Sequence, residues 1–117
     1  MNNVSFTGKA ALISGGASGI GLATAQRLIA QGATVWIADI QDTLGQQIAE
    51  EIGANYLHLD VAKEEEWTSA VELIAGQGQG LHLLMNNAGV AIGGTLETQT
   101  TAEFLQTINI NLLGVFL

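Results

Sequence analysis

The stretch Ser14-Gly15-Gly16-Ala17-Ser18-Gly19-Ile20-Gly21 decides the fold of this 117-residue chain. The apolar run 10–13 precedes it, and the run 20–30, with apolar residues at helical spacing, follows it. A strand, a glycine-rich turn and a helix in this order place backbone N–H groups and a helix N-terminus where they can bind a phosphate. The pattern predicts such a loop here, and an ordinary glycine-rich turn between a strand and a helix is the alternative.

Strand-like and helix-like segments alternate along the rest of the chain. Further β-rich runs cover residues 34–39, 55–59 and 81–85, and helical patterns cover 43–52, 64–75 and 101–117. Asp42 is predicted to cap the second helix, and Thr100 and Glu103 form a capping box for the last one. The alternation predicts an α/β fold, a Rossmann-like doubly wound parallel sheet with its four strands in the order 3-2-1-4.

The composition excludes several classes of partner. The formal charge is −8, and the only Lys and Arg residues are Lys9, Arg27 and Lys63. Nucleic acids and anionic membrane surfaces both require clustered basic residues, so neither partner is expected. The chain has no cysteine, which fits a reducing compartment, and residues 1–9 lack the apolar core of a signal peptide. We therefore expect a single cytoplasmic domain over residues 1–117.

Asp39 ends the second predicted strand, roughly 20 residues after the glycine loop, where dinucleotide-binding folds place an acidic residue. A carboxylate at this point can accept hydrogen bonds from the ribose hydroxyls of NAD, and it would repel the 2′-phosphate of NADP. No Lys or Arg is near it in the sequence, and position 18 in the loop is serine. The residues thus favour NAD as the cofactor, with an Asp that only caps a turn as the alternative.

Four motifs, together with Asp39, make the chain resemble the short-chain dehydrogenase/reductase family. Residues Ser14–Gly21 are similar to the family signature Thr-Gly-x-x-x-Gly-x-Gly, with serine in place of threonine. Asn86-Asn87-Ala88-Gly89 is similar to the Asn-Asn-Ala-Gly signature, and Asp60-Val61 resembles the dipeptide that contacts adenine. Residues 111–116 are similar to the helix segment that bears an active-site Asn. The motifs occur in the family's order and cover essentially the whole chain.

The resemblance implies a role for each matching residue. The implied cofactor-binding residues are Gly15, Ser18, Gly19, Ile20, Gly21, Asp39, Asp60, Val61, Asn87, Ala88 and Gly89. The glycine loop would line the pyrophosphate, Asp39 would hold the adenosine ribose, and Asp60 and Val61 would contact adenine. Asn86 would tie the fourth strand to its neighbours. Asn111, the implied catalytic residue, would hold a water of a proton relay at a local disruption of its helix; a side chain that bonds within its own helix is the alternative.

The implied activity is that of an NAD(H)-dependent oxidoreductase, which interconverts a secondary alcohol and a ketone by hydride transfer. The family uses a Tyr-x-x-x-Lys pair for the acid/base chemistry, and the only tyrosine here, Tyr56, has Asp60 at the position of that Lys. We therefore expect a chain that is truncated before the catalytic region, lacks the C-terminal strands and is inactive alone. A non-catalytic NAD-binding module and a piece that serves only in assembly are the alternatives.

Two further expectations concern metals and assembly. His58 and His82 lie on different predicted strands without acidic or cysteine partners at metal spacing, so no metal site is expected. The fourth strand would be an open apolar edge, and such edges promote association. We expect a homo-oligomer that forms through this edge or through the last helix, and a small alcohol or ketone as the substrate.

Overall fold

The computed structural model describes residues 5–92 and 94–117. The first residues of the N-terminal segment, where no signal peptide is expected, and Gly93 of the linker before the last helix lie outside these ranges. The strands β1 (Ala10–Ser14), β2 (Thr34–Asp39), β3 (Asn55–His58) and β4 (Leu83–Met85) are parallel and form one sheet. Their order is β3-β2-β1-β4, which confirms the predicted topology.

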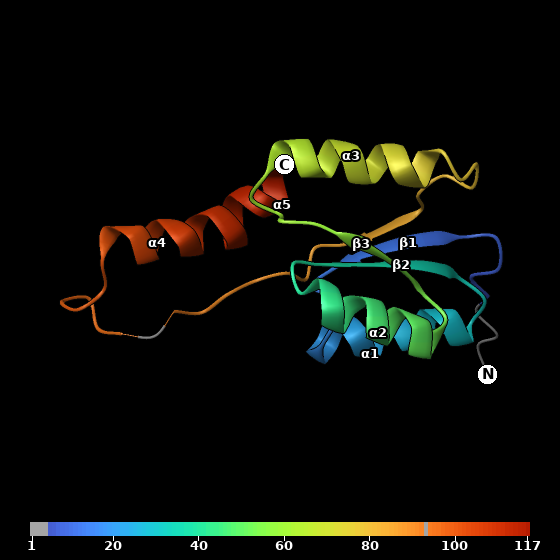
Figure 1. Cartoon of the computed structure of the whole chain (residues 1–117), viewed down its shortest axis with the longest axis horizontal. Coiled ribbons are helices and arrows are strands. Elements are labelled where there is room, and N and C mark those ends of the chain that lie inside the picture. Colours follow the sequence, from blue (N-terminus) through green and yellow to red (C-terminus); the bar gives the residue numbers. More distant parts are fainter. Residues whose placement is uncertain (1–4, 93) are drawn as a thin grey trace.

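Helices cover both faces of this sheet (Figure 1). The helices α1 (Gly19–Ala30) and α2 (Asp42–Ile52) lie on one face, and α3 (Glu64–Ala75) lies on the other. Gly32, with a φ of 93°, follows the end of α1, and Gly53, with a φ of 79°, caps α2 in the left-handed conformation that favours glycine. Both helices thus end at the glycines that the sequence indicated.

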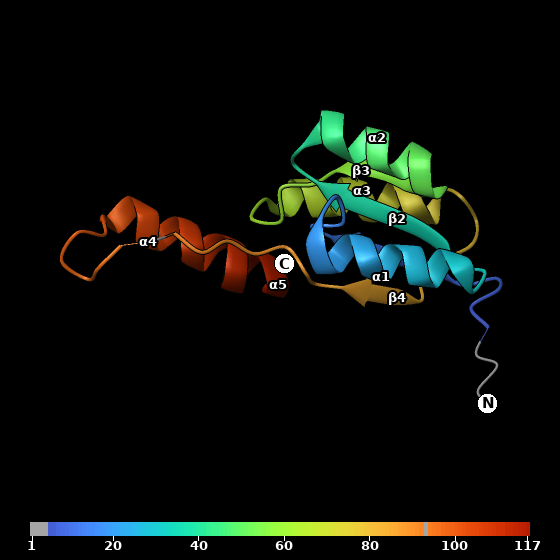
Figure 2. The same ribbon diagram turned by 90° about the horizontal axis from the view of Figure 1, so that it is seen from below.

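Residues 101–116 form one helical rod that extends away from the sheet (Figure 2). It consists of α4 (Thr101–Ile108), the π-helical segment η1 (Asn109–Leu113) and α5 (Gly114–Phe116). The N-cap half of the predicted capping box is confirmed, because Thr100 Oγ1 accepts a hydrogen bond from the Glu103 N–H at 3.1 Å. The Glu103 carboxylate accepts from the Thr100 hydroxyl at 2.9 Å. None of the helices in the described ranges is both long and apolar enough to cross a membrane.

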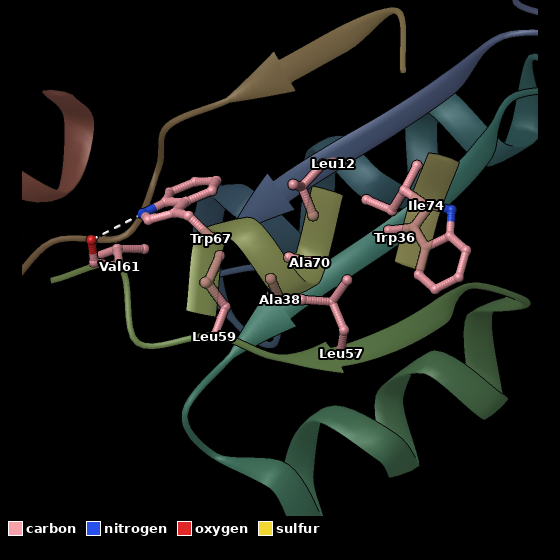
Figure 3. Close-up of a cluster of buried hydrophobic side chains, with 9 residues drawn as sticks. All are labelled: Leu12, Trp36, Ala38, Leu57, Leu59, Val61, Trp67, Ala70 and Ile74. Carbon is pink, nitrogen blue, oxygen red and sulfur yellow. Dashed lines mark hydrogen bonds between the residues drawn. The ribbon is translucent and has the colours of Figure 1, made fainter. Parts of the chain in front are cut away.

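Neighbouring residues of the central strands β1 and β2 are buried against opposite helix layers. Ile13 and Ile37 pack in the cluster between the sheet and the helices α1 and α2. Leu12 packs with Trp67 and Ile74 of α3 in a second cluster (Figure 3). Burying one large apolar side chain contributes about 1.5–3 kcal/mol, so both faces of the sheet stabilise the domain. Burial on both faces explains why these strands read as continuous apolar runs.

Three predicted element ends are wrong, and tertiary contacts explain two of them. The third strand ends at His58 rather than at residue 59. The fourth strand begins at Leu83 rather than at residue 81, because the Ala10 N–H donates to His82 Nδ1 at 3.1 Å instead of to a backbone carbonyl. The predicted cap of α2 is also wrong: Gln41 precedes the helix, and the Asp42 carboxylate bonds Tyr56 and His58 rather than a backbone N–H.

Apolar side chains are exposed on the edge strand and on the rod. Leu83 and Leu84 of β4, which pairs with β1 at the end of the described sheet, are 40% and 44% exposed. On the rod, Phe104, Leu112 and Phe116 are 54%, 65% and 83% exposed. Both surfaces that the sequence indicated for association are therefore apolar and open to solvent.

Candidate functional site

A pocket of about 500 Å³ lies at the carboxyl ends of the four strands. All the predicted cofactor-binding residues except Gly21 line it. Asn111 does not line it, but Gln106 and Ile110 of the same rod do, and no sequence pattern indicated these two. Ligands bind at this edge in open parallel sheets, so the pocket has the position that the fold predicts for a site.

The glycine loop combines two left-handed glycines with a free helix start. Gly15 and Gly19 have φ values of 65° and 56°. A Cβ on Gly19 would meet nothing within 4 Å, so its backbone borders open space in the pocket. Ser18 is the N-cap residue of α1, and its hydroxyl makes no capping bond within the described chain. That hydroxyl and the first N–H groups of α1 can therefore reach a ligand.

The electrostatics of the helix starts differ in a way that favours an anion at α1. The first turn of α1 contains no acidic residue, whereas Asp42 begins α2 and Glu64 begins α3. Acidic side chains in the first turn satisfy the partial positive charge of a helix N-terminus. The start of α1 keeps this charge for a ligand, and a phosphate is the anion that such a loop and helix bind well.

Gly21 contacts the loop rather than the pocket. A Cβ on Gly21 would lie 2.5 Å from the Gly15 carbonyl oxygen and 2.6 Å from Asn87 Nδ2. Asn87 Nδ2 itself donates to the Gly15 carbonyl oxygen at 3.1 Å. Gly21 therefore allows α1 to pack closely on the turn, and it shapes the pocket without lining it.

The hydroxyl of Ser14 joins the glycine loop to the loop after β4, a role that sequence reasoning missed. Ser14 Oγ accepts hydrogen bonds from the N–H groups of Asn87 at 3.1 Å and Ala88 at 3.0 Å, and it donates to the Met85 carbonyl oxygen at 3.4 Å. Ser14 is only 2% exposed. Asn86, in contrast, is exposed and lines a pocket on the α3 side, so the expected tie runs through Ser14 and Asn87 instead.

Asp39 is a buried carboxylate that both closes a turn and borders the pocket. Its Oδ1 accepts hydrogen bonds from the N–H groups of Ile40 at 2.9 Å and Gln41 at 3.2 Å. Its Oδ2 accepts only one hydrogen bond in the described chain, a long one of 3.4 Å from the Ala17 N–H of the glycine loop. Each carboxylate oxygen can accept two, so Oδ2 retains capacity for hydroxyl donors.

Asp60 and Val61 border the pocket after β3, and hydrogen bonds with α3 and with the loop before it hold both residues in place. The Asp60 N–H donates to Glu66 Oε1 at 2.9 Å, and Asp60 Oδ1 accepts from the Ala62 N–H at 3.0 Å. The Val61 carbonyl oxygen accepts from Trp67 Nε1 at 2.9 Å, as Figure 3 shows. The core under α3 therefore determines where this part of the pocket lies.

Asn111 joins the π-helical segment to the chain that follows β4. Its Oδ1 accepts from the Val90 N–H, and its Nδ2 donates to the Val90 carbonyl oxygen, both at 2.8 Å. The alternative of a side chain that bonds within its own helix is therefore wrong. The helix is disrupted at Asn111, as the family resemblance implied, because Asn109–Leu113 is a π-helix. Gly114 follows, and a Cβ there would lie 2.7 Å from Val61 Cγ2.

His58 corrects one expectation from the sequence, because it has two acidic partners. Its Nδ1 lies 2.7 Å from Asp42 Oδ1, and its Nε2 lies 3.2 Å from Glu66 Oε1. The hydrogen bond with Asp42 raises the pKa of His58, and hydrogen bonds with Tyr56 and His58 lower the pKa of Asp42. In the part of the chain that the structure describes, no cluster of His, Cys, Asp and Glu side chains could hold a metal ion.

Known proteins resemble this chain along nearly all of its length. It is 43% identical over 112 residues to 3-alpha-(or 20-beta)-hydroxysteroid dehydrogenase from Mycobacterium tuberculosis, covering 94% of this chain and 43% of that protein. It is 38% identical over 114 residues to cyclopentanol dehydrogenase from Comamonas testosteroni, covering 93% of this chain and 46% of that protein. The chain therefore spans about half the length of the curated relatives that it matches.

A solved structure and a family model agree with these relatives. The crystal structure of 3-ketoacyl-(acyl-carrier-protein) reductase from Brucella melitensis complexed with NADH matches with a TM-score of 0.91 and 33% identity. The match covers 96% of this chain and 47% of that one. The model of the short chain dehydrogenase family matches residues 9–117. The chain therefore belongs to the short-chain dehydrogenase family.

Proposed function

We propose that the chain is the dinucleotide-binding part of an NAD(H)-dependent oxidoreductase that interconverts a secondary alcohol and a ketone. The observation that carries this proposal is the Asp39 carboxylate, which contacts the glycine loop and borders the same pocket. Two relatives support the substrate class, because their names, hydroxysteroid and cyclopentanol dehydrogenase, denote enzymes of secondary alcohols. A similar structure is described as complexed with NADH. When bound, NAD(H) would supply the acceptor or donor of the hydride.

Different residues of the pocket would bind different parts of the dinucleotide. Gly15, Ser18, Gly19 and Ile20, with the start of α1, would hold the pyrophosphate, and the open space beside Gly19 fits such a group. Asp39 would accept hydrogen bonds from the hydroxyls of the adenosine ribose, and Asp60 and Val61 would contact adenine. Asn87, Ala88 and Gly89 would flank the cofactor from the fourth strand, and Gly21 would support the pyrophosphate turn from behind.

We assign the catalytic role in the proton relay to Asn111. Its side chain is held by Val90, and the π-helical turn around it brings Ile110 to the pocket, which supports a place near the reacting groups. An Asn111→Ala variant of an active form of the enzyme that keeps full turnover would contradict this role.

Asp39 is expected to set the preference for NADH over NADPH. Asp39→Ser removes the charged acceptor for the ribose, so we expect NADH affinity to fall at least about tenfold and the preference over NADPH to vanish. Calorimetric titration with both nucleotides measures this. Glu50→Gln, which removes the same charge from the exposed side of α2, is the matched control and should bind like the wild type. Tighter binding of NADPH than of NADH by the wild type would overturn the assignment, and no binding of either would remove the proposal for this chain.

A non-catalytic dinucleotide-binding module is the second candidate, and Tyr56 favours it for these 117 residues. Tyr56 is the only tyrosine, and its hydroxyl is engaged with the Asp39 carbonyl oxygen at 2.8 Å and with the Asp42 carboxylate. Burial raises the pKa of Tyr56, and the hydrogen bond with Asp42 raises it further. Tyr56 is therefore a poor general acid or base. We therefore expect no oxidation of secondary alcohols by this chain in a steady-state assay of NADH formation. Measurable turnover would show that another group performs the acid/base step.

We further propose that the chain forms homo-oligomers through the exposed apolar surfaces of β4 and of the rod, and that it resides in the cytoplasm. The exposure of Leu84, Leu112 and Phe116 supports the first point. The absence of cysteine fits the second. Sedimentation that finds a monomer at all concentrations would contradict the first point, and secretion of the protein in cell fractionation would contradict the second.

A further inference from the structure

His58 occupies the junction of the two loops that border the adenosine end of the proposed site. It is the last residue of β3 and stands in register with Asp39, the last residue of β2. Its side chain is half-exposed, and its two ring nitrogens contact carboxylates from two different helices, Asp42 of α2 and Glu66 of α3. No other side chain in the described chain has ion-pair contacts with both helices.

Both acidic partners of His58 are connected by hydrogen bonds or by the chain itself to residues that line the pocket. On the side of β2, Asp42 begins the helix that follows Asp39, and the Tyr56 hydroxyl lies within hydrogen-bond distance of both the Asp42 carboxylate and the Asp39 carbonyl oxygen. On the side of β3, the Glu66 Oε1 atom that faces His58 also accepts the N–H of Asp60 at 2.9 Å. Asp39 and Asp60 both line the pocket. A chain of direct contacts therefore connects the two loops through the imidazole of His58.

The two contacts require a particular protonation state. A neutral imidazole has one N–H donor and one acceptor nitrogen, so it can donate to only one of two carboxylates. The imidazolium donates from both nitrogens and can hold Asp42 and Glu66 together. When His58 is neutral, one ring nitrogen presents a lone pair to a carboxylate oxygen, and that contact is lost.

We propose that His58 is a positioning residue that holds the loops after β2 and β3 at the separation needed to bind the adenosine half of the dinucleotide, and does so in its protonated form. The inference rests on the proposed function. The ligand class is an adenosine diphosphate ribosyl group, because Asp39 and Asp60 are the pocket residues that the bridge connects. His58 acts through these two loops rather than by contact with the ligand.

The charges around His58 favour the protonated form. The titratable groups around it are Asp42 on α2, Glu66 on α3, Asp60 and Lys63 on the loop before α3, Asp39 on the neighbouring strand β2, and Tyr56 on β3 itself. Lys63 Nζ pairs with the other carboxylate oxygen of Glu66 at 3.6 Å, which leaves Oε1 for His58 and Asp60. Because the pKa of His58 is raised, its bridging contribution is complete below its ordinary value of about 6.5 and is lost as pH rises through the raised value.

The test measures the affinity of the 117-residue chain for ADP-ribose by calorimetry from below to above the pKa of His58. For the wild type we expect affinity to fall about threefold as pH rises, the scale of exposed ion pairs. His58→Gln should bind about threefold more weakly at low pH and show no such fall, because its side chain does not titrate. His82→Asn is the matched control: Asn can replace the acceptor that His82 offers to the Ala10 N–H, and the wild-type profile should persist.

A second measurement needs no ligand. In Glu66→Gln the side-chain oxygen can still accept the Asp60 N–H, but its charge is lost. In the wild type the amide resonance of Asp60 should follow the titration of His58, and in Glu66→Gln this response should vanish while the fold is retained. A purely structural histidine would leave the Asp60 resonance unmoved in both proteins.

The outcomes separate the two proposals. If the wild type binds ADP-ribose with the same pH profile as His58→Gln, or if the Asp60 resonance ignores His58, the positioning role is overturned and the proposed function stands. If nicotinamide riboside shows the same His58 dependence as ADP-ribose, the restriction to the adenosine half is wrong. If the wild type binds neither ADP-ribose nor NADH, the proposed function fails, and this inference fails with it.

Discussion

The Gly21→Ala variant is expected to bind NADH at least about tenfold more weakly than the wild type, because the added methyl group would displace the pyrophosphate turn. The new Cβ would lie 2.5 Å from the Gly15 carbonyl oxygen and 2.6 Å from Asn87 Nδ2. Both atoms belong to backbone or to a hydrogen-bonded side chain, so α1 or the turn has to move. Overpacking of this kind costs about 1–3 kcal/mol of folding free energy, which urea denaturation measures alongside the NADH titration.

Gly76→Ala is the matched control for this prediction. Gly76 ends α3 with a φ of −64°, and a Cβ there would meet its nearest atom at 3.4 Å, an ordinary contact. We expect its NADH affinity to equal that of the wild type and its stability to change by no more than about 0.5 kcal/mol. If Gly21→Ala bound NADH as tightly as Gly76→Ala does, the packing of α1 on Gly15 would not be needed for the site.

The fold could be predicted because its determinants are local and repeated. The central strands β1 and β2 are buried on both faces, so they read as continuous apolar runs, and the helices α1, α2 and α3 each have an apolar stripe with a glycine at or just after the end. Parallel strands with helical crossovers leave few possible topologies, and the family motifs select one of them. The positions of Gly15, Asp39, Asp60 and Asn87 around one pocket follow directly, because each stands at the carboxyl end of its strand.

The features that could not be predicted are those that depend on partners far along the chain. Asp42 is a residue type that is common at helix caps, but its carboxylate forms hydrogen bonds with Tyr56 and His58 of β3 instead. Asn111 bonds Val90, which lies 21 residues earlier. The acidic partners of His58 lie on two helices at opposite faces of the sheet. Local preferences describe what each side chain can do, and the packed structure decides with which partner it does so.

Loss of the Trp67 side chain is expected to be the most damaging single change. Trp67 is buried in the cluster between the sheet and α3 (Figure 3), and its Nε1 donates to the Val61 carbonyl oxygen. Trp67→Ala should lower the free energy of unfolding by about 3–5 kcal/mol through the cavity that it leaves. A domain of this size has a total of about 5–15 kcal/mol, so the variant loses a large share of its stability, and urea denaturation followed by circular dichroism should show a much lower midpoint. A loss below about 1 kcal/mol would contradict the packing of α3 described above.

Two milder variants separate the stability of the core from the shape of the site. Trp67→Phe keeps an aromatic ring but removes the donor to Val61, so we expect a loss of about 1–3 kcal/mol and weaker binding of NADH by the folded protein. Trp36→Phe changes the other tryptophan of the same cluster, which lies away from Val61 in Figure 3 and does not line the pocket. It should reduce stability and leave NADH affinity unchanged. Because the Trp67 indole holds the carbonyl of a pocket residue, we expect the core and the site to be coupled at this position. Equal NADH affinities of Trp67→Phe and Trp36→Phe would contradict this coupling.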